Sequence, residues 1–281
     1  MTRHLAPGSI VLAADGSKHG ERALRWAAGQ ASLQSRPLVV LTVDGGDGHR
    51  INTEACEQAR ALVPPHIEVI PLVTTGDARE VLVDLSEEAH LLVLGSRGRG
   101  PIRTLVLGSV STAVCKLAAC PVVVCRPHDE DRDVRGVLVG VDATPESLTV
   151  LEFAYAHASF NDLPLTIVHC VWDVVAAVAG LRNVSVDDVD LGEGDEAHVV
   201  LAESVAGFAE KYPDVPTTLR VTHGLVDEVL GSRSDAWDIV VVGRHPLDTT
   251  IRMVTGSLAV AVVEQAHTTV AVVPDLTRAT S

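Results

Sequence analysis

Short apolar runs alternate with amphipathic segments along the chain. In the first half the apolar runs, rich in Val, Leu and Ile, are predicted to be strands: "SIVLAAD", "LVVLTV", "IEVIPLVTTG", "LLVLG" and "CPVVVCR". The segments between them are predicted to be helices: "GSKHGERALRWAAGQAS", "ACEQARALV", "DAREVLVDLSEEA" and "SVSTAVCKLAA". Unbroken apolar strands that alternate with helices predict a parallel sheet covered on both faces. Because crossovers between parallel strands are right-handed, we expect an open, doubly wound sheet.

Polar residues mark the expected helix starts. Ser17 and Asp77 are placed to cap helices in the first half of the chain. In the second half, Thr144 is expected to be a cap, with Pro145 at the first helical position. Short oxygen-bearing side chains satisfy amides that a helix start leaves unpaired, and proline suits a position that needs no N–H.

The same pattern occurs twice. "IVLAADGSKHGERALRWAA" matches "VLVGVDATPESLTVLEFAY", which pairs Asp15 with Asp142 at an offset of 142 − 15 = 127. Farther along the chain Gly95 pairs with Gly243, at an offset of 243 − 95 = 148. The second copy therefore has 148 − 127 = 21 extra residues, in a segment that includes "VSVDDVDLGEGDEAH". We predict a solvated acidic surface loop there, with weak Ca²⁺ binding as the alternative.

The repeat defines the domains. We predict two tandem α/β domains, 1–128 and 134–281, each an open, doubly wound, five-stranded parallel sheet with helices on both faces. The charged stretch "RPHDEDRDVRG" lies between the two copies. In sheets of this kind, ligands bind beyond the carboxyl ends of the strands, where the strand order reverses.

Charge and composition restrict the partners. The chain has 22 basic and 37 acidic residues, a formal net charge of −15, and its only aromatic residues are 3 Trp, 2 Tyr and 3 Phe. It lacks a general attraction for phosphate backbones and rings for stacking bases, so we expect no nucleic acid partner. No apolar run approaches the ~18 residues that span a bilayer, and "MTRHLAPGS" is not a signal-peptide pattern. We expect no membrane partner and a cytoplasmic location.

The cysteines suggest no metal centre. The chain has five, and none has C-x-x-C spacing or a His at metal-ligand spacing. We expect reduced structural thiols, with redox sensing as the alternative.

The glycine-rich stretch "VLGSRGRGPIRTLVLGSVSTAV" follows the expected fourth strand. It lacks the Lys of a Walker A loop, and its order G-x-x-G-x-G is not the dinucleotide fingerprint. Gly95 and Gly98 permit positive φ and close approach of backbone N–H groups to a ligand. Gly108 opens a helix whose unpaired N–H groups and dipole favour an anion, and the hydroxyls of Ser109 and Ser111 add donors. The stretch therefore predicts a polyphosphate site.

Three arginines in the same stretch are candidates for added positive charge, with plain solvation as the alternative: Arg97, Arg99 and Arg103. Two residues of the predicted site, Asp15 and Gly108, also have purely structural explanations. Asp15 can organise the turn after the first strand, because Asp-Gly is a turn dipeptide. Gly108 can be a helix-start residue where the chain bends.

Together these motifs resemble the universal stress protein family. The resemblance rests on G-2x-G-9x-G-S, on "DGS" after the first strand and on "CPVVVCR", and it extends over nearly the whole chain as two tandem copies. It implies Rossmann-like domains of the adenine nucleotide alpha hydrolase type, with ATP as ligand and Mg²⁺ or Mn²⁺ beside the phosphates. It also implies that the fifth strands, "VVVC" and "VAVV", pair within the chain as a pseudo-dimer and that chains form a homodimer.

The resemblance implies a role for each matching residue of the first copy. The residues that would hold the phosphates and ribose are Gly95, Gly98, Gly108, Ser109 and Val110. The backbone of Ala13 and the side chain of Asp15 would lie beside the nucleoside, and the backbone of Val43 beside the adenine. Asp15 is also the nearest carboxylate for the metal ion.

The second copy departs from the motif. It keeps four matching residues: Asp142, Gly243, Gly256 and Ser257. It has Pro246 in place of the second glycine, and proline fixes φ near −65° and has no N–H. Each lost charge-assisted hydrogen bond costs about 1.5–3 kcal/mol, so we predict a weakened or lost second site. His245 and Arg252 are candidates for compensation.

No motif of a dedicated enzyme is present. The sequence has no G-x-S-x-G, no H-E-x-x-H and no S-G-G-x-D-S loop, so no catalytic residue is predicted, although slow ATP hydrolysis stays open. The leading hypothesis is an ATP-binding stress-response protein whose nucleotide state controls conformation or partner choice. The alternatives are a nucleotide-free assembly module with vestigial loops and a sensor of another adenine nucleotide, such as cyclic AMP.

Overall fold

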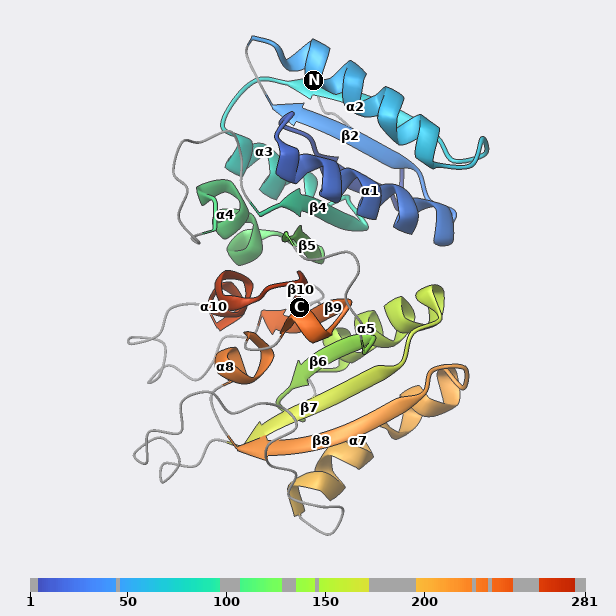
Figure 1. Ribbon diagram of the computed structural model, residues 1–281, viewed down its shortest axis with the longest axis vertical. Coiled ribbons are helices and arrows are strands. Elements are labelled where there is room, and N and C mark those ends of the chain that lie inside the picture. The colour runs from blue at the N-terminus through green and yellow to red at the C-terminus, as the bar shows by residue number, and fades with distance from the viewer. Residues whose placement is uncertain are drawn as a thin grey trace. The chain divides into compact units, whose positions relative to one another are not determined.

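A computed structural model describes most of the chain. The described residues are 5–43, 46–96, 107–127, 135–144, 147–171, 196–223, 226–231, 234–244 and 258–275. The chain divides into two compact units, Met1–Pro127 and His128–Ser281 (Figure 1). Each unit is described by itself below.

The first unit is a parallel sheet between two pairs of helices. Its strands are β1 (Ile10–Ala13), β2 (Leu38–Val43), β3 (Val69–Thr74), β4 (Leu91–Gly95) and β5 (Val122–Cys125). Its helices are α1 (Lys18–Leu33), α2 (Gly48–Leu62), α3 (Ala78–Leu85) and α4 (Ser109–Leu117). The strands lie in the order β3-β2-β1-β4-β5, and every described pair is parallel. Helix α1 packs with α2, and α3 with α4, as a doubly wound sheet requires.

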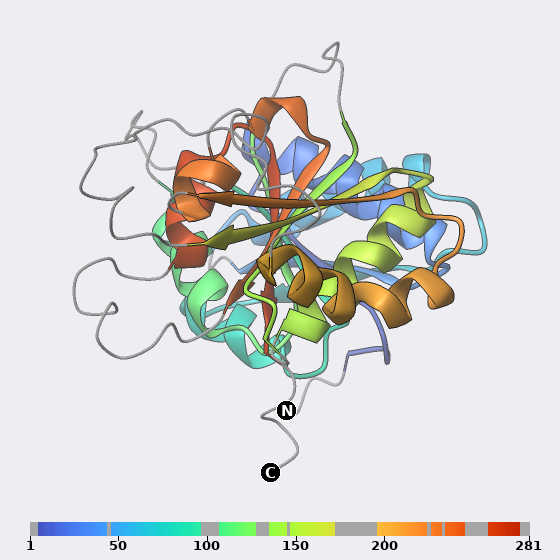
Figure 2. The ribbon, with the colours of Figure 1, turned by 90° about the horizontal axis from the view of Figure 1, so that it is seen from below.

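The second unit repeats this topology. Its strands are β6 (Val137–Val141), β7 (Leu165–Val171), β8 (Thr217–His223), β9 (Ile239–Arg244) and β10 (Thr269–Pro274). Its described helices are α5 (Leu148–Asn161), α7 (Glu196–Lys211), α8 (Val226–Gly231), the 3-10 turn η2 (Ser234–Ala236) and α10 (Leu258–Gln265). The order is β10-β9-β6-β7-β8, again parallel. Helix α5 packs with α7, and α8 with α10 (Figure 2). The predicted fold class is confirmed.

The strands are buried on both faces, which explains their unbroken apolar sequences. Ile10, Val11 and Leu12, three successive residues of β1, are all fully buried. Successive side chains of a strand point to opposite faces, so this burial requires helices on both sides of the sheet.

Two of the predicted caps are confirmed and one is wrong. The hydroxyl of Ser17 accepts a hydrogen bond from the amide of Gly20 at 3.2 Å. The carboxylate of Asp77 accepts one from the amide of Arg79 at 2.9 Å. The residue before α5 is Ser147, whereas Thr144 lies three residues upstream and turns back to Asp142. The α-helix begins at Leu148, later than expected, and the Thr144 hydroxyl donates to the carboxylate of Asp142 instead of capping the helix. Pro145 lies outside the described residues.

An aromatic cluster joins α5 to α7. The ring of Tyr155, which is fully buried, stacks on Phe208 at 5.3 Å and on Tyr212 at 5.7 Å between centroids. The hydroxyl of Tyr212 donates a hydrogen bond to Glu152 at 2.6 Å, and the ammonium of Lys211 lies 2.6 Å from the same oxygen. The cluster packs α7 against α5 in the second unit.

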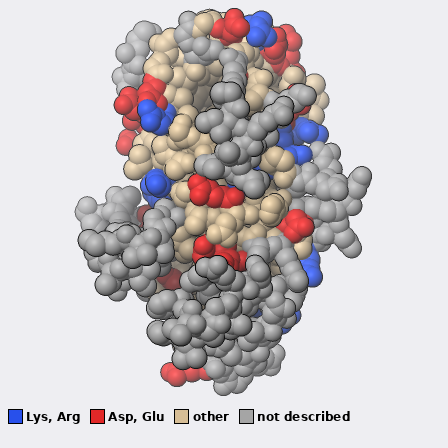
Figure 3. All heavy atoms as spheres, turned by 60° about the vertical axis from the view of Figure 1, so that its left-hand side comes forward, with Lys and Arg blue, Asp and Glu red and all other residues tan. Residues whose placement is uncertain are grey.

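None of the five cysteines forms a disulfide, and all except Cys170 are buried. No helix in the described part of the chain is long and apolar enough to cross a membrane. On the face shown in Figure 3, the described basic side chains are scattered among acidic and uncharged ones and form no continuous patch. Residues 184–195 of the predicted acidic loop "VSVDDVDLGEGDEAH" lie outside the described residues. Its last three residues, Glu196, Ala197 and His198, open helix α7, so the loop prediction is wrong for them.

Candidate functional site

The carboxyl ends of three neighbouring strands of the first unit, β1, β2 and β4, lie side by side. Strand β1 lies between β2 and β4, with Ala13 paired to Leu41 and Leu12 paired to Val93. Two residues farther along, Asp15 is level with Val43, and Gly95 is level with the residue before Asp15. Neighbouring strands are about 4.8 Å apart, so these ends are close in space. The strand order reverses here, between β1 and β4.

The turn after β1 holds the carboxylate of Asp15. Its Oδ1 accepts a hydrogen bond from the amide of Ser17 at 3.0 Å, and Gly16 between them has a φ of +73°. That positive φ favours glycine, which accounts for the Asp-Gly dipeptide. The turn role considered for Asp15 is therefore real. The other carboxylate oxygen has no hydrogen-bond partner among the described residues, so the turn leaves one oxygen available to a ligand.

Hydrogen bonds close the base of the glycine-rich segment. The amide of Ser96 donates to the carbonyl of Cys125 at 3.1 Å, which extends β4 by one residue beyond Gly95. The amide of Gly108 donates to the carbonyl of Ser96 at 3.2 Å. The hydroxyl of Ser111 donates to the carbonyl of Gly95 at 3.1 Å. The start of α4 is thus tied to the end of β4.

Gly95 differs from the expectation. It ends β4, paired with Cys125, and it is not among the described glycines with positive φ, which are Gly8, Gly16, Gly76 and Gly136. The ladder to β5 requires extended backbone at this position, so the conformational freedom of Gly95 is not used.

Helix α4 starts with unpaired amides. Its N-cap, Gly108, has a φ of −63° and no side chain to cap the helix. The first intrahelical bond runs from the amide of Thr112 to the carbonyl of Gly108 at 2.9 Å. The amides of Ser109, Val110 and Ser111 precede this bond and have no partner in the described part of the chain. Ser109 is an exposed residue.

Ser111 has a different role from the one expected of it. Its side chain is 5% exposed, and its hydroxyl proton is given to the carbonyl of Gly95. The hydroxyl is therefore not a free donor for a phosphate, whereas the Ser111 amide still is. The sequence could not distinguish the two, because the acceptor lies 16 residues away on another element.

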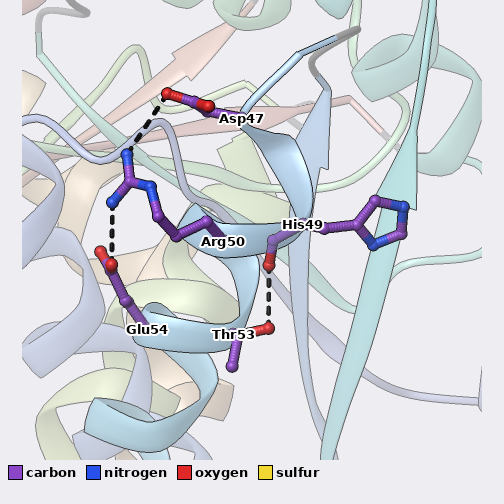
Figure 4. Close-up of polar contacts among 5 residues, drawn as sticks. All are labelled: Asp47, His49, Arg50, Thr53 and Glu54. Atoms are coloured by element: carbon purple, nitrogen blue, oxygen red, sulfur yellow. Dashed lines mark hydrogen bonds and ion pairs between the residues drawn. The ribbon is translucent and has the colours of Figure 1, made fainter.

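The other helix starts that the structure describes in the first unit are unsuited to an anion. Ser17 caps α1, which has Glu21 in its first turn, and Asp77 caps α3. Helix α2 begins after Asp47, whose carboxylate lies 3.5 Å from the guanidinium of Arg50 (Figure 4). The same guanidinium lies 2.8 Å from Glu54, and this hydrogen bond is the main cause of the raised pKa of Arg50. Figure 4 shows the ring of His49 projecting away from this ion-pair group.

The matching end of β6 in the second unit is arranged differently. The carboxylate of Asp142 accepts hydrogen bonds from the Thr144 amide at 3.1 Å, from the Thr144 hydroxyl at 2.7 Å and from the Ser147 hydroxyl. Gly243 pairs with Val273 in the sheet, as Gly95 does with Cys125. The carboxylate of Asp142 is thus more fully engaged by its own chain than that of Asp15.

Two neighbouring positions of the second unit also differ. The position that matches Ser111 is Ala259, since 259 − 111 = 148, and it is buried without a hydroxyl. The position that matches Val43 is Cys170, and burial raises the pKa of its thiol to about 12. Ala259 therefore cannot make the side-chain bond by which Ser111 ties the helix start to the strand end in the first unit.

Several predicted residues lie outside the described part of the chain. In the first copy these are Gly98 and the three arginines, Arg97, Arg99 and Arg103. In the second copy they are His245, Pro246, Arg252, Gly256 and Ser257. The argument that Pro246 weakens the second site therefore stays a prediction.

Among the described residues a metal ion would find few protein ligands, so phosphate oxygens and waters would supply the rest. They contain no cluster of three or more His, Cys, Asp or Glu side chains able to hold a metal ion. Mg²⁺ accompanying phosphates usually takes one or two carboxylates and several waters. Asp15, with one carboxylate oxygen available, fits such a single-ligand role.

Comparison with known proteins shows which family the chain belongs to. The profile of the Universal stress protein family matches residues 46–126 and 134–274. The chain belongs to the universal stress protein family. A universal stress protein of Mycobacterium tuberculosis strain H37Rv is 31% identical, over 94% of this chain and 96% of that protein. A universal stress protein of Mycolicibacterium smegmatis is 30% identical over 94% of this chain and 96% of its own length.

Solved structures of low sequence identity share the fold of this universal stress protein. The crystal structure of a universal stress protein from Archaeoglobus fulgidus has a TM-score of 0.67 at 19% identity, covering 95% of this chain and 96% of that one. A functionally unknown protein from Pseudomonas aeruginosa has a TM-score of 0.68 at 15% identity, with coverage of 96% and 94%. The tandem organisation predicted from the repeat is that of a known family fold.

Proposed function

We propose that this universal stress protein binds ATP in its first unit and acts as a nucleotide-dependent regulator of the stress response. ATP is a ligand in this proposal rather than a substrate. The nucleotide would shift the population of conformations at the carboxyl edge of the first sheet and so change the surface offered to a partner.

One observation carries the proposal. The start of α4 presents three unpaired amides, with neither a capping side chain nor an acidic residue in the first turn. Such a helix start binds phosphate through its N–H groups and its dipole. It is tied to the end of β4, at the sheet edge where Asp15 and Val43 also lie. The other three described helices of the first unit begin beside a capping hydroxyl or a carboxylate.

The described residues of the site would then contact different parts of the nucleotide. The amides of Ser109 and Val110 and the Ser109 hydroxyl would bind the phosphates, with Gly108 leaving room for them. The backbone of Ala13 and Val43 would face the nucleoside. The available oxygen of Asp15 would bind a ribose hydroxyl or a Mg²⁺ or Mn²⁺ ion on the phosphates.

The second unit is proposed to bind more weakly or not at all. The carboxylate of Asp142 is engaged by Thr144 and Ser147, and Ala259 cannot make the bond that Ser111 makes. Each lost hydrogen bond is worth about 1 kcal/mol, and about 1.4 kcal/mol is a tenfold change in affinity. The predicted loss of a donor at Pro246 acts in the same direction.

Released nucleotide gives the direct test. The protein is purified without added nucleotide and then denatured. The nucleotide released into the supernatant is identified and quantified by chromatography and mass spectrometry. About one ATP per chain supports the proposal. Two per chain would show that the second unit binds equally well and that the argument from Pro246 is wrong.

If no nucleotide is released, calorimetric titration with Mg-ATP and with cyclic AMP separates the alternatives. Preference for cyclic AMP would change the ligand but keep the site. Absence of binding for both at millimolar concentration would contradict the proposal and favour a nucleotide-free assembly module. Association of two chains, and pairing of the two fifth strands within one chain, stay predictions; light scattering after size-exclusion chromatography tests the first of them.

A further inference from the structure

The base of the glycine-rich segment is held by a side chain as well as by the backbone. The hydroxyl of Ser111 donates to the carbonyl of Gly95 at 3.1 Å, and the amide of Gly108 donates to the carbonyl of Ser96 at 3.2 Å. The two bonds bracket the segment between Ser96 and Leu107. Because the Ser111 side chain and Ser96 are only 5% and 3% exposed, water competes poorly for these groups.

The hydroxyl bond connects the first turn of α4 to the end of β4. Ser111 is in the first turn of the helix, and its own amide is one of the three unpaired ones. A bond from this turn to the last residue of β4, together with the bond from the Gly108 amide to Ser96, restrains the helix start relative to the end of β4. A phosphate bound by several amides requires them at mutually fixed positions, so ordering them before binding raises affinity.

A second hydroxyl bond at the far end of α4 provides a comparison. The amide of Ala119, just beyond the helix, donates to the hydroxyl of Ser86 at 2.7 Å, and that hydroxyl donates to the carbonyl of Val83. Ser86 is 1% exposed. Helix α4 is therefore held by one buried serine near each end, and only Ser111 adjoins the unpaired amides.

The second unit shows the same position without the hydroxyl. Ala259 occupies the site that matches Ser111 and is 2% exposed. The change is confined to one oxygen atom at a buried position, so it removes the bond without a change of fold. This is a difference between the two units that the glycine motif alone does not reveal.

We infer that Ser111 is a positioning residue for the nucleotide: its bond to Gly95 holds the start of α4 in the arrangement that binds phosphate. The inference rests on the proposed function for its effect on affinity. Its structural half, that the hydroxyl orders the helix start, holds for the protein without nucleotide and is tested separately.

The test compares three variants of the full chain. Ser111→Ala removes the hydroxyl, Ser111→Thr retains it, and Ser86→Ala removes the matched buried hydroxyl at the other end of α4. For each variant we would measure the Kd of Mg-ATP by calorimetry, the melting temperature of the nucleotide-free protein, and hydrogen exchange of the amides of Gly108 and Thr112, which are hydrogen-bonded at the helix start.

The expected results separate positioning from general stability. Ser111→Ala should weaken ATP binding about five- to tenfold, as the loss of one buried hydrogen bond implies. It should also speed exchange at the start of α4. Ser86→Ala should lower the melting temperature as much as Ser111→Ala does, but should leave the Kd within about twofold of the wild-type value. Ser111→Thr should keep both ATP binding and protection from exchange.

Two results would overturn the inference. One is equal Kd values for Ser111→Ala and the wild type, with unchanged exchange of the amides of Gly108 and Thr112. The other is an equal loss of affinity in Ser86→Ala, which would make the effect one of stability. If the wild type binds no nucleotide, the proposed function fails. The exchange data then still decide whether Ser111 orders the helix start.

Discussion

The side-chain nitrogen of Asn52 lies 2.7 Å from the carbonyl oxygen of Val40 in the core of the first unit. The same nitrogen lies 3.2 Å from the hydroxyl of Thr42 and 3.3 Å from the carbonyl of Leu72, and the side chain is 2% exposed. One buried amide therefore connects α2 to both β2 and β3. The strand β2 that it secures ends at Val43, in the candidate site.

Replacement of Asn52 should lower the stability of the protein. Asn52→Ala leaves buried acceptors short of a donor, which costs about 1–3 kcal/mol. Asn52→Asp keeps the shape but removes both donors and buries a charge, so it should be the more destabilising variant. Urea denaturation of both variants measures the free energy of unfolding. A change below about 0.5 kcal/mol in Asn52→Ala would contradict the proposed connection.

Asp15 should be needed for nucleotide binding and Asp142 should not. Asp15→Asn keeps an oxygen that can accept the bond from Ser17, so the turn is preserved while the charge is removed. We expect at least a tenfold increase in the Kd of Mg-ATP, because charge-assisted contacts are the strong ones.

The matched variant Asp142→Asn should change neither the Kd of the first site nor the number of nucleotides per chain. If Asp15 holds the metal ion, chelation with EDTA should weaken binding in the wild type and have little further effect in Asp15→Asn. Equal losses of affinity for Mg-ATP in Asp15→Asn and Asp142→Asn would show that the two units contribute equally to nucleotide binding.

The aromatic cluster should carry much of the packing between α5 and α7. Tyr155 is fully buried between Phe208 and Tyr212, so Tyr155→Ala should lower the free energy of unfolding by about 3–5 kcal/mol. Phe160 on the same helix is 47% exposed, and Phe160→Ala should cost less than about 0.5 kcal/mol. Chemical denaturation followed by circular dichroism would show the difference, and similar losses for both variants would argue against the cluster.

Stability should fall in mild acid because of a buried histidine. His157 is 6% exposed on α5, with its ring stacked on Phe153, and burial lowers its pKa from 6.5 to about 4. Between these values the unfolded chain binds a proton that the folded protein does not. This contribution to stability is therefore complete above about pH 6.5 and is lost as the pH falls toward 4, at up to about 1.4 kcal/mol per pH unit.

The variant His157→Gln should show a smaller loss of stability between pH 6.5 and 4 than the wild type. Other titrating groups are common to both proteins, so the difference between the two curves isolates this histidine. His66→Gln, at an exposed position, serves as control and should follow the wild-type curve. Parallel curves for His157→Gln and the wild type would contradict the assignment.

The sequence by itself determined the fold and the location of the candidate site. Strands buried on both faces must be apolar at every position, so runs such as that of β1 can be recognised without any partner. Parallel connections bring all carboxyl ends to one edge, so Asp15, Val43 and Gly95 could be placed together from their positions at strand ends. The caps at Ser17 and Asp77 were also predictable, because each bonds an amide only two or three residues away.

Only the tertiary structure decided the contacts that distinguish one polar residue from another. Helix α2 begins at Gly48, seven residues before the predicted segment, and its buried Asn52 finds acceptors on two strands, which no local pattern indicates. The hydroxyl of Ser111 is committed to Gly95, and the stacking of Tyr155 joins residues more than 50 positions apart. Local periodicity reports which face of an element is buried, whereas a hydrogen bond or a ring contact depends on what another element places opposite it.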